Sequence, residues 1–344
     1  LISNHTFGNL ILRPNGVAPT TIGHDGKPVG DAPDEVELKR LGARMAAQNG
    51  YSNQHGWQLY DTTGTTEDWS YNATGGFGYT FEIGPDEFHP PFEDVVDQYR
   101  GAGEYAGKGN REAYLIALEH AVDTSMHGVL TGKAPRGAVL RLHKSFVTPT
   151  WEGGFEDGVD SSIRVPANGS FRWVVNPSTR PVVASHTYLA GLDEPRSAET
   201  FEGTAPPAGS SDHEFQIQEQ ADLWRTTLTW PTPDDLDLEV YRKAADGTLT
   251  EVGSSGNLPG SDEVVELTDA QPGTYVLRVI NYASVSPSYT LTTVLFDGRV
   301  VRTEGKREQY TLTCSVGRNV RQTMKVFVDR GQVRSLDLRA CRKR

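Results

Sequence analysis

The expected fold of this chain depends first on residues 34–50, which read DEVELKRLGARMAAQNG. The apolar residues of this stretch recur at the i, i+3, i+7 spacing of one helix face: Leu38, Leu41 and Met45. Asp34 and Glu37 form a capping-box pattern, and Gly50 is placed to end the helix in the left-handed conformation. The stretch therefore predicts an amphipathic helix over about residues 34–48.

Strand patterns lie on both sides of this helix. Short apolar runs at residues 9–13, 57–61 and 78–83 are typical of β-strands. A second, longer helix is predicted at about residues 110–129, capped by Asn110. Its apolar stripe is formed by four residues: Leu115, Leu118, Val122 and Val129. Strands separated by helices indicate an α/β layer architecture for about the first 130 residues.

The sequence pattern changes after about residue 135. Short alternating segments separated by turns rich in Gly, Pro, Asp and Ser predict an all-β sandwich. These segments are 138–142, 170–175, 225–230, 236–241, 274–280 and 289–295. Residues 195–213 carry Pro, Gly, Ser and acidic residues, and we expect them to form a linker or a long loop.

Length and charge restrict the function classes. A chain of 344 residues suggests two or three domains. Its net charge of −12 excludes broad affinity for nucleic acid, and no apolar run approaches the roughly 20 residues of a membrane span. Residues 301–344 carry 12 Lys and Arg against 4 Asp and Glu, a balance of +8. This basic tail is either a solvated hairpin or a contact with an anionic surface such as a cell-wall polymer.

The two cysteines, Cys314 and Cys341, both lie in this tail. They belong to no Cys-x-x-Cys or His-rich pattern, so cysteine ligation of zinc is not expected. A single disulfide that closes the terminal segment is the natural interpretation. It implies an oxidising compartment, and we expect a secreted, extracellular protein.

Three clusters in the first 90 residues carry residues capable of chemistry. They contain His5, Tyr60 and Glu82. A histidine beside an apolar strand is more often structural than a metal ligand. Glu82 interrupts an apolar strand, where a carboxylate is unfavourable unless it is paired or faces a cleft. Desolvation would raise its pKa toward the range that suits a general base near neutral pH.

Together, these clusters resemble the zinc metallocarboxypeptidases of the carboxypeptidase A type. The family's histidine motif, followed by an apolar run, corresponds to His5-Thr6-Phe7 and residues 10–16. Its loop motif Tyr-x-x-x-Gly-x-x-x-Asp-Trp-x-Tyr is matched in order by Tyr60, Gly64, Asp68, Trp69 and Tyr71. Its Thr-Phe-Glu-Leu strand corresponds to Thr80-Phe81-Glu82-Ile83. The resemblance covers about residues 1–130.

The resemblance implies a role for each of four residues. His5 would be the third zinc ligand, and Glu82 would activate water as the general base. Tyr60 would hydrogen-bond the substrate, which would be the C-terminus of a peptide or protein. Glu67 occupies the position that lines the pocket for the terminal side chain. A carboxylate there would favour Lys or Arg, or else Glu67 turns to solvent.

The sequence also departs from this family. None of the nine histidines is followed by Glu at i+3, so the His-x-x-Glu pair that supplies two of the three zinc ligands is missing. The arginine and Asn-Arg residues that the family uses on substrate are missing as well. We therefore expect one zinc ion in an intact enzyme, a chain that is a fragment of it, and no activity from these 344 residues alone.

The β region carries a second resemblance. Residues 213–295 are similar to the bacterial pre-peptidase C-terminal domain, a small sandwich found behind secreted proteases. Asp235 and Asp237 would then be either calcium ligands or alternating residues on an exposed strand. Such appended domains commonly bind substrate or an extracellular surface.

The expected organisation has four parts. They are the C-terminal half of a carboxypeptidase catalytic domain (1–132), an unassigned β unit (133–205), a pre-peptidase-like sandwich (206–297) and a basic hairpin segment (298–344). The expected fold class is α/β: a partial, mixed metallocarboxypeptidase sheet with flanking helices, followed by all-β sandwich domains. The expected function is peptide hydrolysis at the C-terminus. The alternative is a non-catalytic binding protein built on a degenerate peptidase half.

Overall fold

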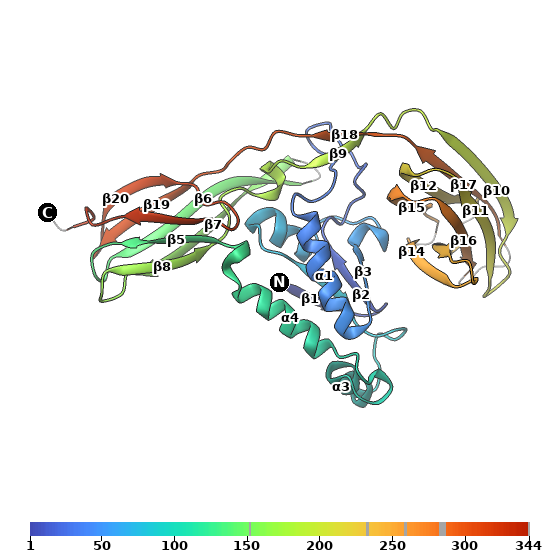
Figure 1. The fold of residues 1–344 in the computed structure, drawn as a ribbon, viewed down its shortest axis with the longest axis horizontal. Helices are drawn as coiled ribbons and strands as arrows, with labels where there is room; N and C mark the ends of the chain where they lie inside the picture. Colours follow the sequence, from blue (N-terminus) through green and yellow to red (C-terminus); the bar gives the residue numbers. More distant parts are fainter. Residues whose placement is uncertain (151–152, 232–233, 258–259, 282–286, 343–344) are drawn as a thin grey trace.

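The computed structural model describes residues 1–344 except 151–152, 232–233, 258–259, 282–286 and 343–344. Its parts lie in a row, with a helix-containing unit between two β-sandwiches (Figure 1). Strands form 45% of the structure and helices 18%, so the expected α/β fold class is wrong and the protein is β-rich. The reason is that the α-helices are confined to residues 35–122, whereas strands continue to residue 337.

The first part, residues 1–126, is called here the helical unit. Its sheet has the order β1-β4-β2-β3. The strands are β1 (Ile2–His5), β2 (Leu10–Arg13), β3 (Ser52–His55) and β4 (Tyr79–Glu82). β1 pairs with β4 and β2 with β3 in parallel, whereas β2 and β4 are antiparallel, so the sheet is mixed.

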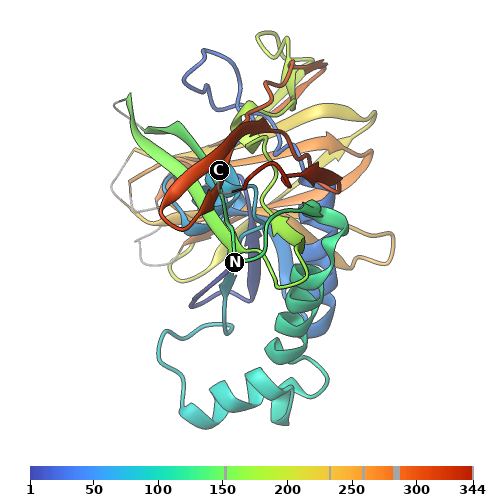
Figure 2. The same ribbon diagram turned by 90° about the vertical axis from the view of Figure 1, so that its left-hand side faces the viewer.

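Four α-helices belong to this unit: α1 (Glu35–Asn49), α2 (Thr66–Trp69), α3 (Phe92–Arg100) and α4 (Asn110–Val122). Short helices of other types are η1 (Gly56–Gln58), η2 (Ser70–Thr74), η3 (Gly103–Tyr105), η4 (Thr124–Met126) and, beyond this unit, η5 (Pro181–Val183). The side view shows α3 and α4 extending away from the sandwiches (Figure 2). The predicted helix at 34–48 is confirmed, since its apolar stripe is buried and Gly50 ends it with φ 76°.

Several local predictions are wrong, each for a physical reason. Residues 57–61 contain part of η1 instead of a strand. Asp34 does not cap α1 with its side chain, because that carboxylate accepts the Tyr71 hydroxyl and pairs with Arg330. The second helix ends at Val122. Of its predicted apolar stripe, Leu115, Leu118 and Val122 are exposed, because α4 buries Ala113 and packs Tyr114 on the sheet side. Val129 lies beyond the helix, in a strand, and is buried.

The next sandwich, called here the disulfide sandwich, combines two distant stretches of sequence. One of its sheets has the order β20-β19-β6-β7 and the other β21-β5-β8. The strands are β5 (Gly128–Lys133), β6 (Val139–Thr150), β7 (Gly153–Arg164), β8 (Ser170–Val175), β19 (Tyr310–Val316), β20 (Asn319–Val326) and β21 (Val333–Asp337). One hydrophobic core, with Trp173 and Tyr310 among its members, joins both stretches.

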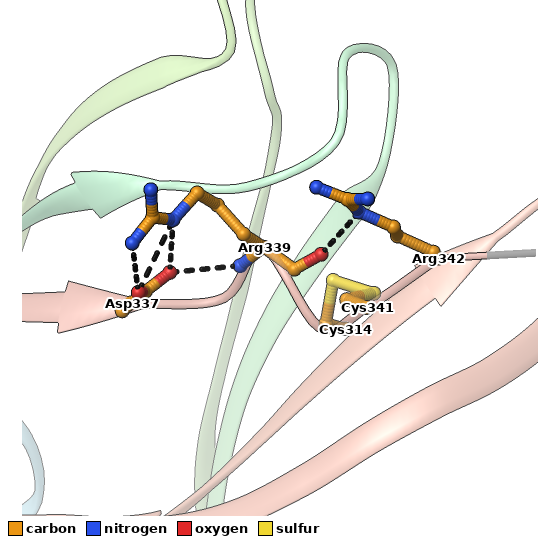
Figure 3. The surroundings of a disulfide bond; sticks show 5 residues. All are labelled: Cys314, Asp337, Arg339, Cys341 and Arg342. Atoms are coloured by element: carbon orange, nitrogen blue, oxygen red, sulfur yellow. Dashed lines mark hydrogen bonds and ion pairs between the residues drawn. A yellow bond between two sulfur atoms is a disulfide. The ribbon is translucent and has the colours of Figure 1, made fainter.

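The predicted disulfide between Cys314 and Cys341 is present and buried in that core. It joins β19 to the segment after β21, beside an ion pair between Asp337 and Arg339 (Figure 3). The segment after β21 is thereby attached to the sandwich at Cys341.

The other sandwich, called here the Trp224 sandwich, has sheets of order β10-β17-β12-β15 and β11-β16-β13-β14. The strands are β10 (Ser197–Thr204), β11 (Ser210–Ile217), β12 (Ala221–Thr229), β13 (Leu236–Lys243), β14 (Leu249–Ser255), β15 (Glu263–Ala270), β16 (Gly273–Asn281) and β17 (Ser288–Phe296). β9 (Thr187–Ala190) and β18 (Arg299–Arg302) pair as a two-stranded ribbon between the sandwiches.

The linker predicted at 195–213 is wrong, because β10 and the first part of β11 occupy it. Polar residues dominate these strands because both lie at sheet edges and alternate inward and outward. The composition of residues 195–213 is therefore similar to that of a loop, although the residues form edge strands. Among the described helices, none is both long and apolar enough to cross a membrane.

Candidate functional site

Strand register places two of the predicted residues next to each other. His5 ends β1 and Glu82 ends β4, and the two residues are directly paired in the parallel register. Neighbouring residues in register point to the same face of a sheet. The His5 Nδ1 atom accordingly lies 3.5 Å from Glu82 Oε1. The His5 side chain is 55% exposed and that of Glu82 only 7%, so histidine forms the outer edge of this pair.

The environment of Glu82 alters its acidity. Burial raises the pKa of the Glu82 carboxyl above its ordinary value, His5 lowers it and Glu67 raises it further. Desolvation favours the neutral form of a carboxyl group, and a second carboxylate acts in the same direction. Glu82 is therefore a stronger base when ionised than a solvated glutamate would be, as general-base chemistry requires.

Glu67 does not turn to solvent. It lies in α2 and is 4% exposed, and its carboxylate accepts the Thr80 hydroxyl at 2.7 Å. Thr80 lies two residues before Glu82 on β4, so both residues point to one face. Gly78 permits this packing, because a Cβ atom there would lie 2.6 Å from the Glu67 Cα atom.

Tyr60 completes the set. It is 45% exposed, and its hydroxyl has no hydrogen-bond partner among the described residues. His5, Tyr60, Glu67 and Glu82 all line one pocket of about 340 Å³, called here the Glu82 pocket. Five threonines also line it: Thr62, Thr63, Thr65, Thr66 and Thr80. The pocket thus combines two carboxylates, an imidazole, a phenol and several hydroxyls.

Two residues important for this arrangement were not predicted as site residues. Thr80 holds Glu67, and its signal in the sequence was the i, i+2 spacing from Glu82. Asp68 accepts the Gly16 amide at 2.9 Å behind the pocket. Burial raises the pKa of Asp68 to about 6, with Gly16 lowering it and Glu67 raising it. In the sequence, the adjacent carboxylate of Glu67 was the signal that could have identified Asp68.

A catalytic zinc ion requires three protein ligands and an open position. Among the described residues, no group of three His, Cys, Asp or Glu side chains is arranged to hold a metal ion. His5 and Glu82 supply at most two donors. The described residues alone therefore do not fit a catalytic zinc site. Asp235 and Asp237, considered above as calcium ligands, likewise belong to no such metal-binding group among the described residues. Burial and neighbouring carboxylates raise the pKa of Asp237 to about 7.

Comparison with known proteins supports a peptidase relationship for part of the chain. No protein-family model matches it. A zinc carboxypeptidase of Saccharothrix mutabilis subsp. capreolus is 38% identical over 88 residues. The match covers 26% of this chain and 19% of that relative's length. A pre-peptidase C-terminal domain is not shown by these comparisons.

Solved structures resemble the chain only weakly. The Yersinia pseudotuberculosis-derived mitogen has a TM-score of 0.25 and 15% identity, covering 33% of this chain and 100% of its own. PirA has a TM-score of 0.24 and 11% identity, covering 30% of this chain and 99% of its own. Likenesses at this level support no conclusion about function.

Proposed function

We propose that residues 1–132 form part of the catalytic domain of a secreted zinc metallocarboxypeptidase, which removes C-terminal residues from peptides. The observation that supports this most is the Glu82 pocket. Four residues chosen from three separate sequence motifs line one cavity, and a relative of part of the chain is a zinc carboxypeptidase. The remaining zinc ligands would lie on residues outside the 344 of this sequence.

Three residues of the pocket take part in the proposed reaction. Glu82 accepts the proton of the attacking water and later donates it to the departing amine, which its raised pKa favours. Tyr60 lines the pocket, and its hydroxyl donates a hydrogen bond to the substrate. His5 would supply one nitrogen ligand to a metal ion completed by residues outside this sequence. No further step is assigned to the metal, because the described residues do not form its site.

The surface of the helical unit supports a larger catalytic domain. β1 is an edge strand of the sheet, so one side of its backbone has no strand partner among the described residues. Apolar side chains are exposed on the helices, with Phe92 at 76%, Val122 at 70% and Leu118 at 57%. An open strand edge and exposed large apolar side chains are typical of surfaces that another segment covers.

The first test is the coding sequence upstream of Leu1. An in-frame His-x-x-Glu motif, followed by an Asn-Arg pair, would support the fragment proposal. An initiation codon at Leu1 would overturn it and favour a non-catalytic binding protein. The 344-residue chain itself should not bind zinc stoichiometrically in calorimetry, and tight one-to-one binding would show that a complete site lies within it.

The second test is catalytic and uses the intact protein. Glu82→Gln should lower kcat by about 100- to 10,000-fold, because it removes the general base. Zinc content should stay close to that of the wild type. Glu87→Gln is the matched control, since Glu87 is exposed in the loop after β4. Retention of most activity by Glu82→Gln would disprove the assignment.

The preference of the proposed enzyme for the terminal side chain of its peptide substrate follows from Glu67. A buried carboxylate is stabilised by a positive partner, and an apolar terminus would leave it without one. The intact enzyme should therefore cleave peptides ending in Arg faster than those ending in Phe, measured as kcat/KM. Glu67→Ile should shift the preference toward Phe, whereas Glu67→Gln keeps an acceptor for Thr80 and controls for folding. A wild type that prefers Phe would contradict this role.

A further inference from the structure

The segment that carries Tyr60 and Glu67, residues 59–69, lies between the two sandwiches and is called here the Tyr60 loop. At its start, the Leu59 carbonyl accepts the amide of Gly256, which follows β14 of the Trp224 sandwich, at 3.2 Å. At its end, the Trp69 indole Nε1 donates to Asp157 Oδ2 on β7 of the disulfide sandwich, also at 3.2 Å. Each end of the loop is therefore attached to a different β unit, as the arrangement in Figure 1 allows.

A second connection runs through the neighbouring segment 14–31 of the helical unit. Thr20 Oγ1 donates to both carboxylate oxygens of Glu266 in the Trp224 sandwich, at 2.8 and 3.0 Å. Glu266 is buried and is held in place by Arg225. The Thr20 segment is thus fixed from outside the helical unit.

This segment in turn holds the middle of the Tyr60 loop. The Gly16 carbonyl accepts the Thr62 amide at 2.8 Å, and Asp61 accepts the Ala18 amide at 3.2 Å. Gly16 is needed for this approach, because a Cβ atom there would lie 2.8 Å from the Thr62 carbonyl oxygen. The loop has little regular structure before α2, so these contacts fix its course.

We infer that the two sandwiches position the Tyr60 loop against the Glu82 pocket, with Asp157 and Thr20 as the positioning residues. The inference rests on the proposed function for its catalytic consequence. The sandwiches touch no reacting group; they act through Tyr60 and Glu67. A loop that is already held in its bound conformation loses less conformational freedom when substrate binds. The attachment should therefore affect KM more than kcat.

The first experiment measures hydrogen exchange in the 344-residue chain and needs no activity. Amides of residues 59–69 should exchange about two- to tenfold faster in Asp157→Ala, which removes the acceptor, and in Trp69→Phe, which removes the donor; this is the range expected from one lost hydrogen bond. Asp160→Ala is the matched control, because Asp160 lies on the same strand and pairs with Arg141 instead. Unchanged exchange in both variants would overturn the inference.

The connection through Thr20 is tested in the same way. Thr20→Val should accelerate exchange in residues 59–69, whereas Thr21→Val should not, since the Thr21 side chain has no hydrogen-bond partner among the described residues. Equal effects of the two variants would show that the segment is merely destabilised and that Glu266 does not act through it.

The catalytic readout uses the intact enzyme and a peptide ending in Arg. Asp157→Ala should raise KM about two- to tenfold and leave kcat within about twofold, in line with a lost contact that positions the binding loop. Faster exchange with an unchanged KM would contradict a positioning role. Absence of any peptidase activity in the wild type would refute the proposed function alone, because the exchange result stands without it.

Discussion

Asp68 offers a direct test of the electrostatics behind the pocket, in the chain as it stands. Its Oδ2 atom accepts the Gly16 amide, while Oδ1 is buried without a hydrogen-bond partner among the described residues. Burial and the neighbouring Glu67 raise its pKa from 3.8 to about 6, against the effect of Gly16. Asp68→Asn keeps a carbonyl oxygen for Gly16 and removes the buried charge.

The magnitude follows from linkage between proton binding and folding. Because the pKa of Asp68 is raised in the folded state, ionisation disfavours folding, and stability is lost as pH rises from about 4 to about 6. A shift of about 2 pKa units corresponds to about 3 kcal/mol above pH 6. Near pH 4 the folded-state carboxyl is largely protonated, so the effect falls to about 0.5 kcal/mol.

Asp68→Asn should therefore stabilise the helical unit by up to about 3 kcal/mol at pH 7.5 and very little at pH 4. Because a chain with three separate cores does not have to unfold in one two-state transition, the assay is denaturant-dependent hydrogen exchange read on α1 and β4. Asp86→Asn, at an exposed position after β4, is the control. A stabilisation that is the same at both pH values, or a destabilised variant at pH 7.5, would refute the reasoning.

Two further predictions concern the disulfide sandwich. Mass spectrometry without reductant should find no free thiol, and two alkylatable thiols in native protein would contradict the disulfide. Replacing Cys314 and Cys341 by Ala should lower the free energy of unfolding by about 3–4 kcal/mol, because the disulfide closes a loop of 27 residues. Lys144 Nζ lies 3.3 Å from Glu308 in the buried part of this sandwich. Glu308→Gln leaves buried cations unpaired and should cost about 3–5 kcal/mol, more than Lys144→Met, in urea unfolding; the reverse order would contradict a buried charge cluster.

Short-range patterns in the sequence predicted the local structure well where one face of an element is buried. The helix after residue 34 was predicted from three apolar residues that do lie in the core. β4 was predicted from an apolar run, and each of its four residues is buried. The four candidate site residues were chosen from motifs up to 77 positions apart, and the fold brings them to one pocket.

Long-range pairing could not be predicted in the same way. β19 pairs with β6 across more than 160 residues of sequence, and local alternation does not indicate which strand is the partner. The α4 helix presented a regular apolar stripe, yet the sheet receives Ala113 and Tyr114 instead. The periodicity therefore predicted the helix but not the face through which it packs on the sheet.

The Glu82 pocket contains no Lys or Arg among its described lining residues. The exposed imidazole of His5 is the one nitrogen base among these lining residues, and Glu67 contributes to the raised pKa of Glu82. A cationic substrate side chain bound at Glu67 would offset that contribution. In the proposed enzyme, recognition of the terminal residue would therefore be coupled to ionisation of the base.

This coupling has a kinetic signature in the intact enzyme. The acid limb of the kcat/KM profile reports the pKa of the free enzyme. Its midpoint should therefore lie at the same pH for a peptide ending in Arg and for one ending in Phe. The acid limb of kcat reports the complex, and it should lie at lower pH for the Arg peptide, because the bound guanidinium neutralises Glu67 and lowers the pKa of Glu82. In Glu67→Ile the two peptides should give the same limb. Identical kcat limbs in the wild type would mean that the terminal side chain binds away from Glu67, whichever peptide the enzyme prefers.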